Sequence, residues 1–308
     1  MVEIMYRLSF PMVRSKVIDK LFRGWNKIIV AILRKLYPAY CKCHPVVSGV
    51  TDQKYDKEVV ISMTTFPARY ETAVFTLESI LRQTMKPNKI LLWLTKEENP
   101  EQKIPELFMP YVEKGVQVCF SDSNLMPHDK SFHTAKMGAD RYIITVDDDT
   151  LYSEKLVERL YGTYQANPAN TVVCELAHWI TLDEEGLPRP YDEWDHEAKG
   201  IAGPSHRLMA KGVGGVLYPP DFFRDGYFDE DTIRRTCLMA DDLWLKFQAV
   251  TRGYPVVKTR KYAKQVFTAD VRSQRVSLCS KNNGEKRNNV QLRNLIEEFP
   301  DIPWTSFQ

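Results

Sequence analysis

The sequence predicts an α/β fold, in which a mixed, mainly parallel sheet is flanked by helices and preceded by an amphipathic N-terminal helical segment. Three observations support this prediction. The chain of 308 residues is long enough to bury a sizeable core. Short β-rich runs alternate with helical stretches from residue 58 onward. Basic residues are concentrated before that point. We therefore divide the chain into a basic amphipathic N-terminal segment, residues 1–57, and a folded domain, residues 58–308.

The composition excludes several classes of protein. Hydrophobic residues make up 44% of the chain and charged residues 27%, which is typical of a folded globular protein and not of a disordered one. The net charge is only +2, which argues against a dedicated nucleic-acid binder. The six cysteines have no regular spacing, so we interpret Cys41 and Cys43 as incidental and the compartment as a reducing cytoplasm.

The N-terminal segment combines positive charge with helical periodicity. Residues 1–44 contain nine Lys or Arg residues and two acidic ones, a balance of +7. Apolar residues recur every three or four positions over residues 16–37. No apolar run is long enough to span a bilayer. We expect an interfacial helix that attaches the protein peripherally to an anionic membrane surface, at the inner face of the cell membrane. The alternative is a helix whose apolar face packs on the protein body or on a partner.

The domain begins with a predicted strand at residues 59–64, followed by a helix over 71–84 that ends before Pro87 and Asn88. Further strands are expected at residues 89–94, 116–120 and 142–146, with helices near 104–113 and 131–139. This alternation indicates βαβ units and a parallel sheet covered on both faces. Ligands of such sheets bind beyond the carboxyl ends of the strands.

Three acidic residues, Asp147, Asp148 and Asp149, follow the strand at residues 142–146. Three adjacent carboxylates repel one another unless a cation or hydrogen-bond donors compensate them. Their hard oxygen atoms suit Mg²⁺ or Mn²⁺ bound to a diphosphate. The alternative is a solvated acidic turn that caps a helix beginning near Ser153.

With this cluster in view, the chain resembles the GT-A glycosyltransferases, whose fold is Rossmann-like, over roughly residues 58–300. It resembles in particular the family 2-like bacterial enzymes of capsular polysaccharide and lipopolysaccharide biosynthesis. The matching features are residues 62–69, residues 81–94, the acidic cluster at the position of the DXD motif, the Gly-Gly run at 214–220 and the acidic pair at 240–244. The resemblance implies a hexosyltransferase that moves a sugar from a nucleotide-diphosphate sugar, with a UDP-sugar expected, to a saccharide or lipid-linked saccharide. Inversion at the anomeric carbon is favoured.

The resemblance also implies roles for individual residues. It assigns the nucleotide to Thr64, Thr65 and Arg69, the divalent cation to Asp149 and Asp147, and the general base to Asp242 with Asp241 as its competitor. A cation and basic side chains would neutralise the leaving diphosphate, and a carboxylate would accept the proton of the acceptor hydroxyl. We add five residues to the nucleotide-sugar site from their positions in the sequence: Lys130, Asp147, Asp148, Gly214 and Gly215.

Each of these assignments has a structural alternative. Lys130 is then an ordinary surface lysine, and the glycines serve a plain turn before Pro219 and Pro220. One carboxylate of the Asp241 and Asp242 pair is then simply the N-cap of the helix that follows.

Other functions fit the sequence less well. A haloacid dehalogenase-type phosphatase also has a strand that ends in Asp-x-Asp, but about three strands precede this one, and Leu151 occupies a place where that class has Thr or Val. A nucleotidyltransferase is disfavoured because no glycine-rich, Lys-containing loop follows the first strand. A catalytically silent, membrane-associated scaffold of the same fold would be expected to lose Asp149 or Asp242, and both are present. The oligomeric state stays open.

Overall fold

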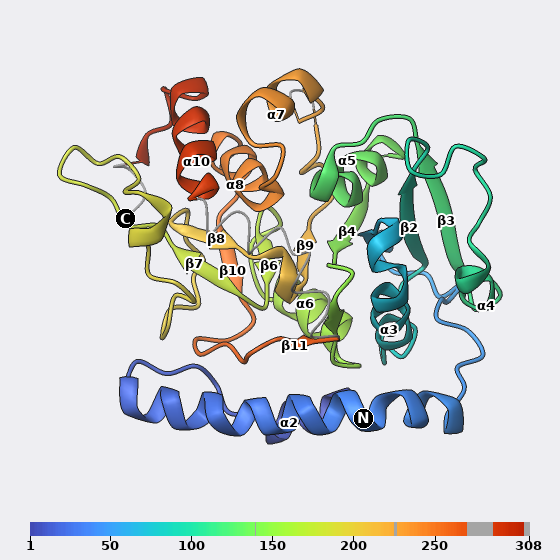
Figure 1. The fold of residues 1–308 in the computed structure, drawn as a ribbon. Helices are drawn as coiled ribbons and strands as arrows, with labels where there is room; N and C mark the ends of the chain where they lie inside the picture. The colour runs from blue at the N-terminus through green and yellow to red at the C-terminus, as the bar shows by residue number, and fades with distance from the viewer. Residues whose placement is uncertain (139, 225–226, 270–285, 305–308) are drawn as a thin grey trace.

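A central seven-stranded sheet organises the molecule, with the strand order β10-β6-β9-β4-β1-β2-β3 (Figure 1). The computed structural model describes residues 1–138, 140–224, 227–269 and 286–304. The strands are β1 (Glu58–Thr64), β2 (Lys89–Thr95), β3 (Val116–Ser121), β4 (Arg141–Thr145), β6 (Val172–Cys174), β9 (Val216–Tyr218) and β10 (Val256–Lys258).

Most neighbouring strands in this sheet are parallel, and β9 is the exception. Parallel pairs join β1 to β2 and β4, β2 to β3, and β6 to β10. Strand β9 lies antiparallel between β4 and β6. The predicted mixed, mainly parallel α/β fold is therefore confirmed. Two small antiparallel sheets complete it, one of β5 (Thr150–Leu151) with β11 (Phe267–Thr268), the other of β7 (Ala177–Trp179) with β8 (Leu208–Ala210).

Helices cover both faces of the sheet. Side chains of successive strand residues point to opposite faces, so neighbouring residues of one strand pack in different cores. On β4, Ile144 packs in the core that contains α3 (Tyr70–Ile80), α4 (Met109–Val112) and α6 (Leu156–Gln165). Its neighbour Ile143 packs in the core that contains α5 (Asp129–Lys136), α7 (Glu230–Thr236), α8 (Asp241–Thr251) and α10 (Arg287–Glu298). Short 3₁₀ turns link these elements: η1 (Pro67–Arg69), η2 (Glu106–Phe108), η3 (Met126–His128), η4 (Tyr191–Glu193) and η5 (Gly212–Gly214).

The N-terminal segment forms two helices, α1 (Val2–Leu8) and the long α2 (Lys16–Cys43), which runs beneath the sheet in Figure 1. The helix predicted over residues 16–37 is confirmed, and it continues through Pro38. One face of α2 is buried against the small β5 and β11 sheet, where Leu33 and Tyr37 pack in the same cluster as Leu151 and Phe267. This face therefore packs on the protein body, as the alternative interpretation expected.

The opposite face of α2 remains exposed, with large apolar side chains along it. In the part of the chain that the structure describes, no helix carries the apolar stretch needed to cross a membrane.

Candidate functional site

The residues that follow β4, which we call the acidic loop (Asp147, Asp148 and Asp149), fold back at once into strand β5. The backbone N–H of Asp147 donates to the hydroxyl of Tyr152 at 2.9 Å, and that hydroxyl donates to the carbonyl of Val213 in η5 at 3.1 Å. Tyr152 thus joins the start of the acidic loop to η5. The sequence offered no motif or periodicity by which to predict this role of Tyr152.

The middle residue of the acidic loop, Asp148, is buried and fully paired. It accepts hydrogen bonds from the hydroxyl of Thr65 at 2.7 Å and from Arg69 at 2.6 Å, and its exposed fraction is 5%. Burial raises the pKa of Asp148, and the contacts with Arg69 and Thr65 offset only part of that increase. Asp148 therefore holds the acidic loop against the end of β1 and against η1.

The last residue of the acidic loop, Asp149, is also buried and lies close to Arg69. The residue is 7% exposed, and its carboxylate lies 3.5 Å from Arg69. Burial and the neighbouring Asp147 raise the pKa of Asp149 to about 6, against the opposing effect of Arg69. Its backbone carbonyl accepts a hydrogen bond from the N–H of Ala269, directly after β11. A nearby positive charge would therefore stabilise the ionised form of Asp149.

Lys130 connects the acidic loop to the start of α8. Its ammonium lies 2.6 Å from Asp147 and 2.9 Å from Asp241. Burial lowers the pKa of Lys130, but the surrounding carboxylates outweigh it and hold the pKa well above its usual value. The backbone carbonyl of Lys130 also accepts a hydrogen bond from Ser62 of β1 at 2.5 Å, which fixes α5 on the sheet. With an exposed fraction of 4%, Lys130 is not an ordinary surface lysine.

The second acid of the pair, Asp242, is held by the backbone of η5. Its carboxylate accepts the N–H of Gly212 at 2.9 Å. A Cβ atom at Gly212 would lie 3.0 Å from that carboxylate and 3.3 Å from the ammonium of Lys130, so the absence of a side chain lets the turn approach both groups. Burial, followed by the charge of Asp241, raises the pKa of Asp242, and Lys130 offsets part of the rise.

The structure brings together most, but not all, of the predicted site residues. One contiguous group comprises Thr65, Arg69, Lys130, Asp147, Asp148, Asp149, Asp241 and Asp242. Thr64 lies at the end of β1, and its hydroxyl donates to the carbonyl of Trp93 at 3.2 Å. Gly214 and Gly215 pack closely against Leu176 and Leu156. These last three residues adjoin the group through the backbone.

The structure excludes two of the alternatives for these acids. Asp148 and Asp149 are buried, and the N-cap of α6 is Lys155, so the acidic loop is not a solvated cap. The N-cap of α8 is Ala240, which places Asp241 and Asp242 in the first turn of the helix.

The charge balance of the group fits a bound divalent cation. Among the residues that the structure describes, five carboxylates (Asp147, Asp148, Asp149, Asp241 and Asp242) lie near two basic side chains, Lys130 and Arg69. Within the described ranges, no three His, Cys, Asp or Glu side chains are gathered as a ready cation site.

Comparison with known proteins finds a distant similarity to a glycosyltransferase. No protein-family model matches the chain. A protein of Haloferax volcanii, glucosyl-dolichyl phosphate glucuronosyltransferase, is 23% identical over 137 residues. The match covers 44% of this chain and 43% of the relative, so it spans less than half of either protein. At this distance, the similarity points to glycosyltransferases as a class.

Proposed function

We propose that the protein is a metal-dependent glycosyltransferase that moves a sugar from a nucleotide-diphosphate sugar, with a UDP-sugar as the expected donor, to a saccharide or lipid-linked saccharide. One observation carries the proposal. Lys130 joins Asp147, at the carboxyl end of β4, to Asp241, at the start of α8. The acidic loop, which suits a cation and a diphosphate, therefore lies beside Asp241 and Asp242, and a carboxylate of this pair can accept the proton of the acceptor hydroxyl.

In this proposal the donor is held at the acidic loop. Asp149 and Asp147 would hold Mn²⁺ or Mg²⁺, which neutralises the charge that develops on the leaving diphosphate. Arg69 and Lys130 add positive charge at the same edge of the sheet. Asp148 and Thr65 keep the acidic loop in place through their hydrogen bond. Thr64, Gly214 and Gly215 shape the backbone on either side of the donor.

Sugar transfer would take place between the acidic loop and α8. The acceptor hydroxyl oxygen attacks the anomeric carbon, and the bond from that carbon to the diphosphate breaks. The nucleoside diphosphate leaves with the bonding electrons, and Asp242 takes the hydroxyl proton. A single displacement of this kind inverts the anomeric configuration. The raised pKa of Asp242 suits a general base better than an ordinary surface carboxylate would. Asp241, paired with Lys130, would anchor the acceptor hydroxyl.

The distant relative supports the class of reaction in this proposal. Its name specifies the transfer of a glucuronosyl group and glucosyl-dolichyl phosphate, a lipid-linked sugar. We extend only the class of reaction to this chain, because specificity for one sugar depends on pocket shape and hydrogen-bond placement.

The test is a thermal-shift panel of nucleoside diphosphates with and without Mn²⁺, followed by product analysis with the matching nucleotide sugar. A ligand that binds only the native state raises the melting temperature. We expect one nucleoside diphosphate to raise it in Mn²⁺ and to lose most of that effect in chelator. A phosphatase would instead release phosphate from a phosphomonoester, and a silent scaffold would bind a nucleotide without any transfer. Either result would contradict the proposal.

A further inference from the structure

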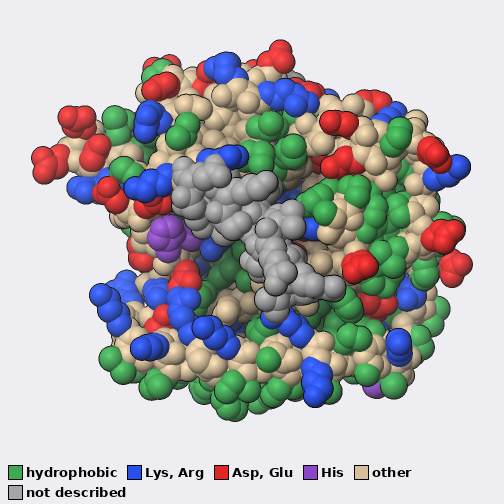
Figure 2. All heavy atoms as spheres, viewed as in Figure 1, with side chains coloured by type: hydrophobic (Ala, Val, Ile, Leu, Met, Phe, Trp, Pro, Cys, Tyr) green, Lys and Arg blue, Asp and Glu red, His purple; other side chains and the backbone are tan. Residues whose placement is uncertain are grey.

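The outward surface of the N-terminal helices is unusually apolar. Most of the large hydrophobic side chains that are exposed among the described residues lie within residues 4–36. We call this surface the basal face; it consists of Ile4, Leu8, Phe10, Val17, Ile18, Leu21, Trp25, Ile28, Ile32 and Leu36. In Figure 2 hydrophobic side chains line the lower rim of the molecule, where Figure 1 places α2. An exposed patch made of this many large apolar side chains marks an interaction site.

The basal face is rigidly held, because α2 is fixed to the body by its other side. Leu33 and Tyr37 are buried against the small β5 and β11 sheet. The segment between α1 and α2 is held as well. Phe10 stacks on Phe22 with ring centroids 4.3 Å apart, and the indole N–H of Trp25 donates to the carbonyl of Leu8 at 3.1 Å. The two helices and their connection therefore present one preformed surface.

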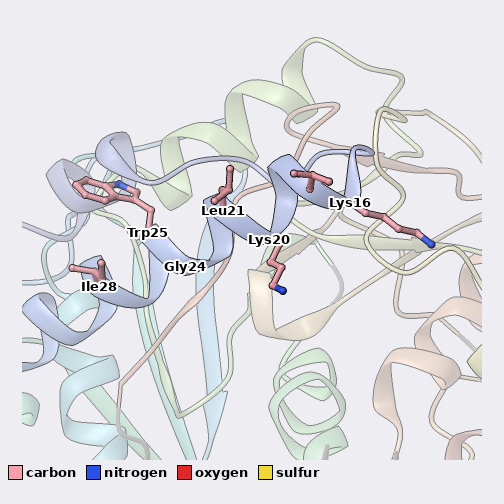
Figure 3. A pocket seen from close by; sticks show the side chains of 7 residues that line it. Lys16, Lys20, Leu21, Gly24, Trp25 and Ile28 are labelled. Atoms are coloured by element: carbon pink, nitrogen blue, oxygen red, sulfur yellow. The ribbon is translucent and has the colours of Figure 1, made fainter.

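The charges around the basal face have a single sign. Both acidic residues of the first 44 are turned toward the body. Asp19 accepts hydrogen bonds from Arg23 and from the N–H of Val13, and Glu3 contacts Ser153. In contrast, Lys16, Lys20, Lys27 and Lys35 are exposed along α2. Figure 3 shows Leu21, Trp25 and Ile28 on α2, no side chain at Gly24 between them, and Lys16 and Lys20 toward the N-terminal end of the helix.

We propose that the basal face binds the surface of an anionic phospholipid membrane, with α2 lying in the plane of the headgroups. The apolar side chains would enter the boundary between headgroups and acyl chains, and the lysines would contact lipid phosphates. Charge separates this occupant from a second copy of the chain. Two basal faces packed together would bring like-charged lysines close to one another, whereas an anionic bilayer neutralises them.

This inference is independent of the proposed enzyme activity, but it bears on the position of the site. Helix α2 packs against β5, which begins directly after Asp149. The N–H of Ala269, directly after β11, also binds the carbonyl of Asp149. A membrane bound to the basal face would therefore lie one layer of helix away from the acidic loop.

The test is binding of the full chain to phospholipid vesicles, in the absence of donor and acceptor. We expect binding to vesicles of phosphatidylglycerol and phosphatidylcholine, little binding to phosphatidylcholine alone, and weaker binding as salt increases. The double variant Leu21→Ser, Ile28→Ser should bind roughly tenfold or more weakly, because two apolar side chains no longer leave water. Lys20→Gln, Lys27→Gln should bind about 25-fold more weakly, at roughly fivefold for each lysine.

Matched controls change equally exposed positions away from the basal face. Val47→Ser, Val290→Ser and Lys54→Gln, Lys103→Gln should bind like the unaltered chain. Brominated lipids should quench the exposed Trp25, and Trp25→Phe should remove that quenching. Three results would overturn the proposal: no binding to anionic vesicles, equal binding by the basal-face variants, or a concentration-dependent dimer that those variants abolish. None of these outcomes depends on whether sugar transfer occurs.

Discussion

At the scale of single residues, Asp241 and Asp242 are adjacent in the chain but held by different partners. Asp241 lies 2.9 Å from Lys130, whereas Asp242 accepts the backbone N–H of Gly212. Because burial and Asp241 raise the pKa of Asp242, the folded protein binds that proton more tightly than the unfolded chain does. The stability that this proton contributes is present at low pH and is lost as pH rises through the raised pKa.

The first prediction concerns Asp242→Asn. The amide oxygen of Asn can still accept the N–H of Gly212, and the substitution removes a half-buried carboxyl group whose ionised form Asp241 destabilises. We expect donor affinity to be retained, the free energy of unfolding near neutral pH to stay equal or rise, and turnover to fall by roughly two orders of magnitude or more. Denaturant titration, donor binding and product formation measure these quantities. Near-normal turnover, or a product that retains the anomeric configuration, would contradict the role of Asp242 as base in an inverting transfer.

The second prediction is a pH dependence that Asp241 controls. A base must be ionised, so kcat/KM should rise with pH through the raised pKa of Asp242, above the ordinary range of an aspartate. Asp241→Asn removes a negative charge that raises the pKa of Asp242 and leaves the positive charge of Lys130, which lowers it. The rise in kcat/KM should therefore move to lower pH. Asp241→Asn should also weaken acceptor affinity or stability more than turnover. An unchanged profile in that variant would show that another group limits the rate.

The third prediction tests the metal at Asp149. Asp149→Asn keeps the size of the side chain but removes the charge. We expect a folded protein whose turnover falls by roughly two orders of magnitude or more and no longer responds to Mn²⁺. Circular dichroism and initial rates over a Mn²⁺ series would check this. Full activity of the unaltered enzyme in excess chelator would rule out the metal role.

At the scale of elements, η5 shows how a turn without side chains can complete a site. A Cβ at Gly212 would meet Asp242 and Lys130. Gly212→Ala should therefore displace one of these charged groups and lower turnover at least tenfold, with little loss of secondary structure. The matched control is Gly162→Ala in α6, where a Cβ meets nothing within 4 Å. It should stabilise the fold by up to about 1 kcal/mol and leave activity unchanged. Equal activity of the two variants would show that η5 tolerates a side chain.

The same elements show what the sequence can and cannot predict. Strands β1 to β4 are apolar runs bounded by turn residues, and their positions were predicted to within one or two residues. Strand β9 has only three residues and follows a glycine turn, so no period could identify it. Helix α3 ends at Ile80, before the predicted Thr84, because the chain turns there, and Gln83 binds the backbone of Ser153.

Within the site, residue types could be predicted but partners could not. The acidic loop stood out as three adjacent carboxylates at a strand end. Its pairing of Asp148 with Arg69 joins residues from two different strand ends, a contact that only the folded sheet creates. The close approach of Lys130 to Asp241 likewise depends on how α5 and α8 sit on the sheet. Local patterns carry no information about such distances.

At the scale of the whole molecule, α2 is part of the fold as well as a surface. Leu33 has an exposed fraction of 0% and Leu36, three residues later, of 47%. We expect Leu33→Ala to lower the free energy of unfolding by about 3 kcal/mol, the typical cost of a cavity in a core. Leu36→Ala should change it by less than about 0.5 kcal/mol. Urea denaturation of the two variants measures the difference. Equal effects would mean that α2 does not pack on the body in solution.

Strand β9 also has a consequence for the order in which the chain folds. It is the strand through which β4 is joined to β6 and β10, with Leu217 opposite Ile144 on one side and Val173 on the other. Each of these pairings closes a long loop, so its entropic cost must be met before the contacts stabilise it. Strands β1, β2 and β3 can associate earlier, because the paired residues of β1 and β2, and of β2 and β3, lie closer together along the chain. In a refolding experiment with pulsed hydrogen exchange, the amide of Leu217 should therefore become protected after those of β1 and β2.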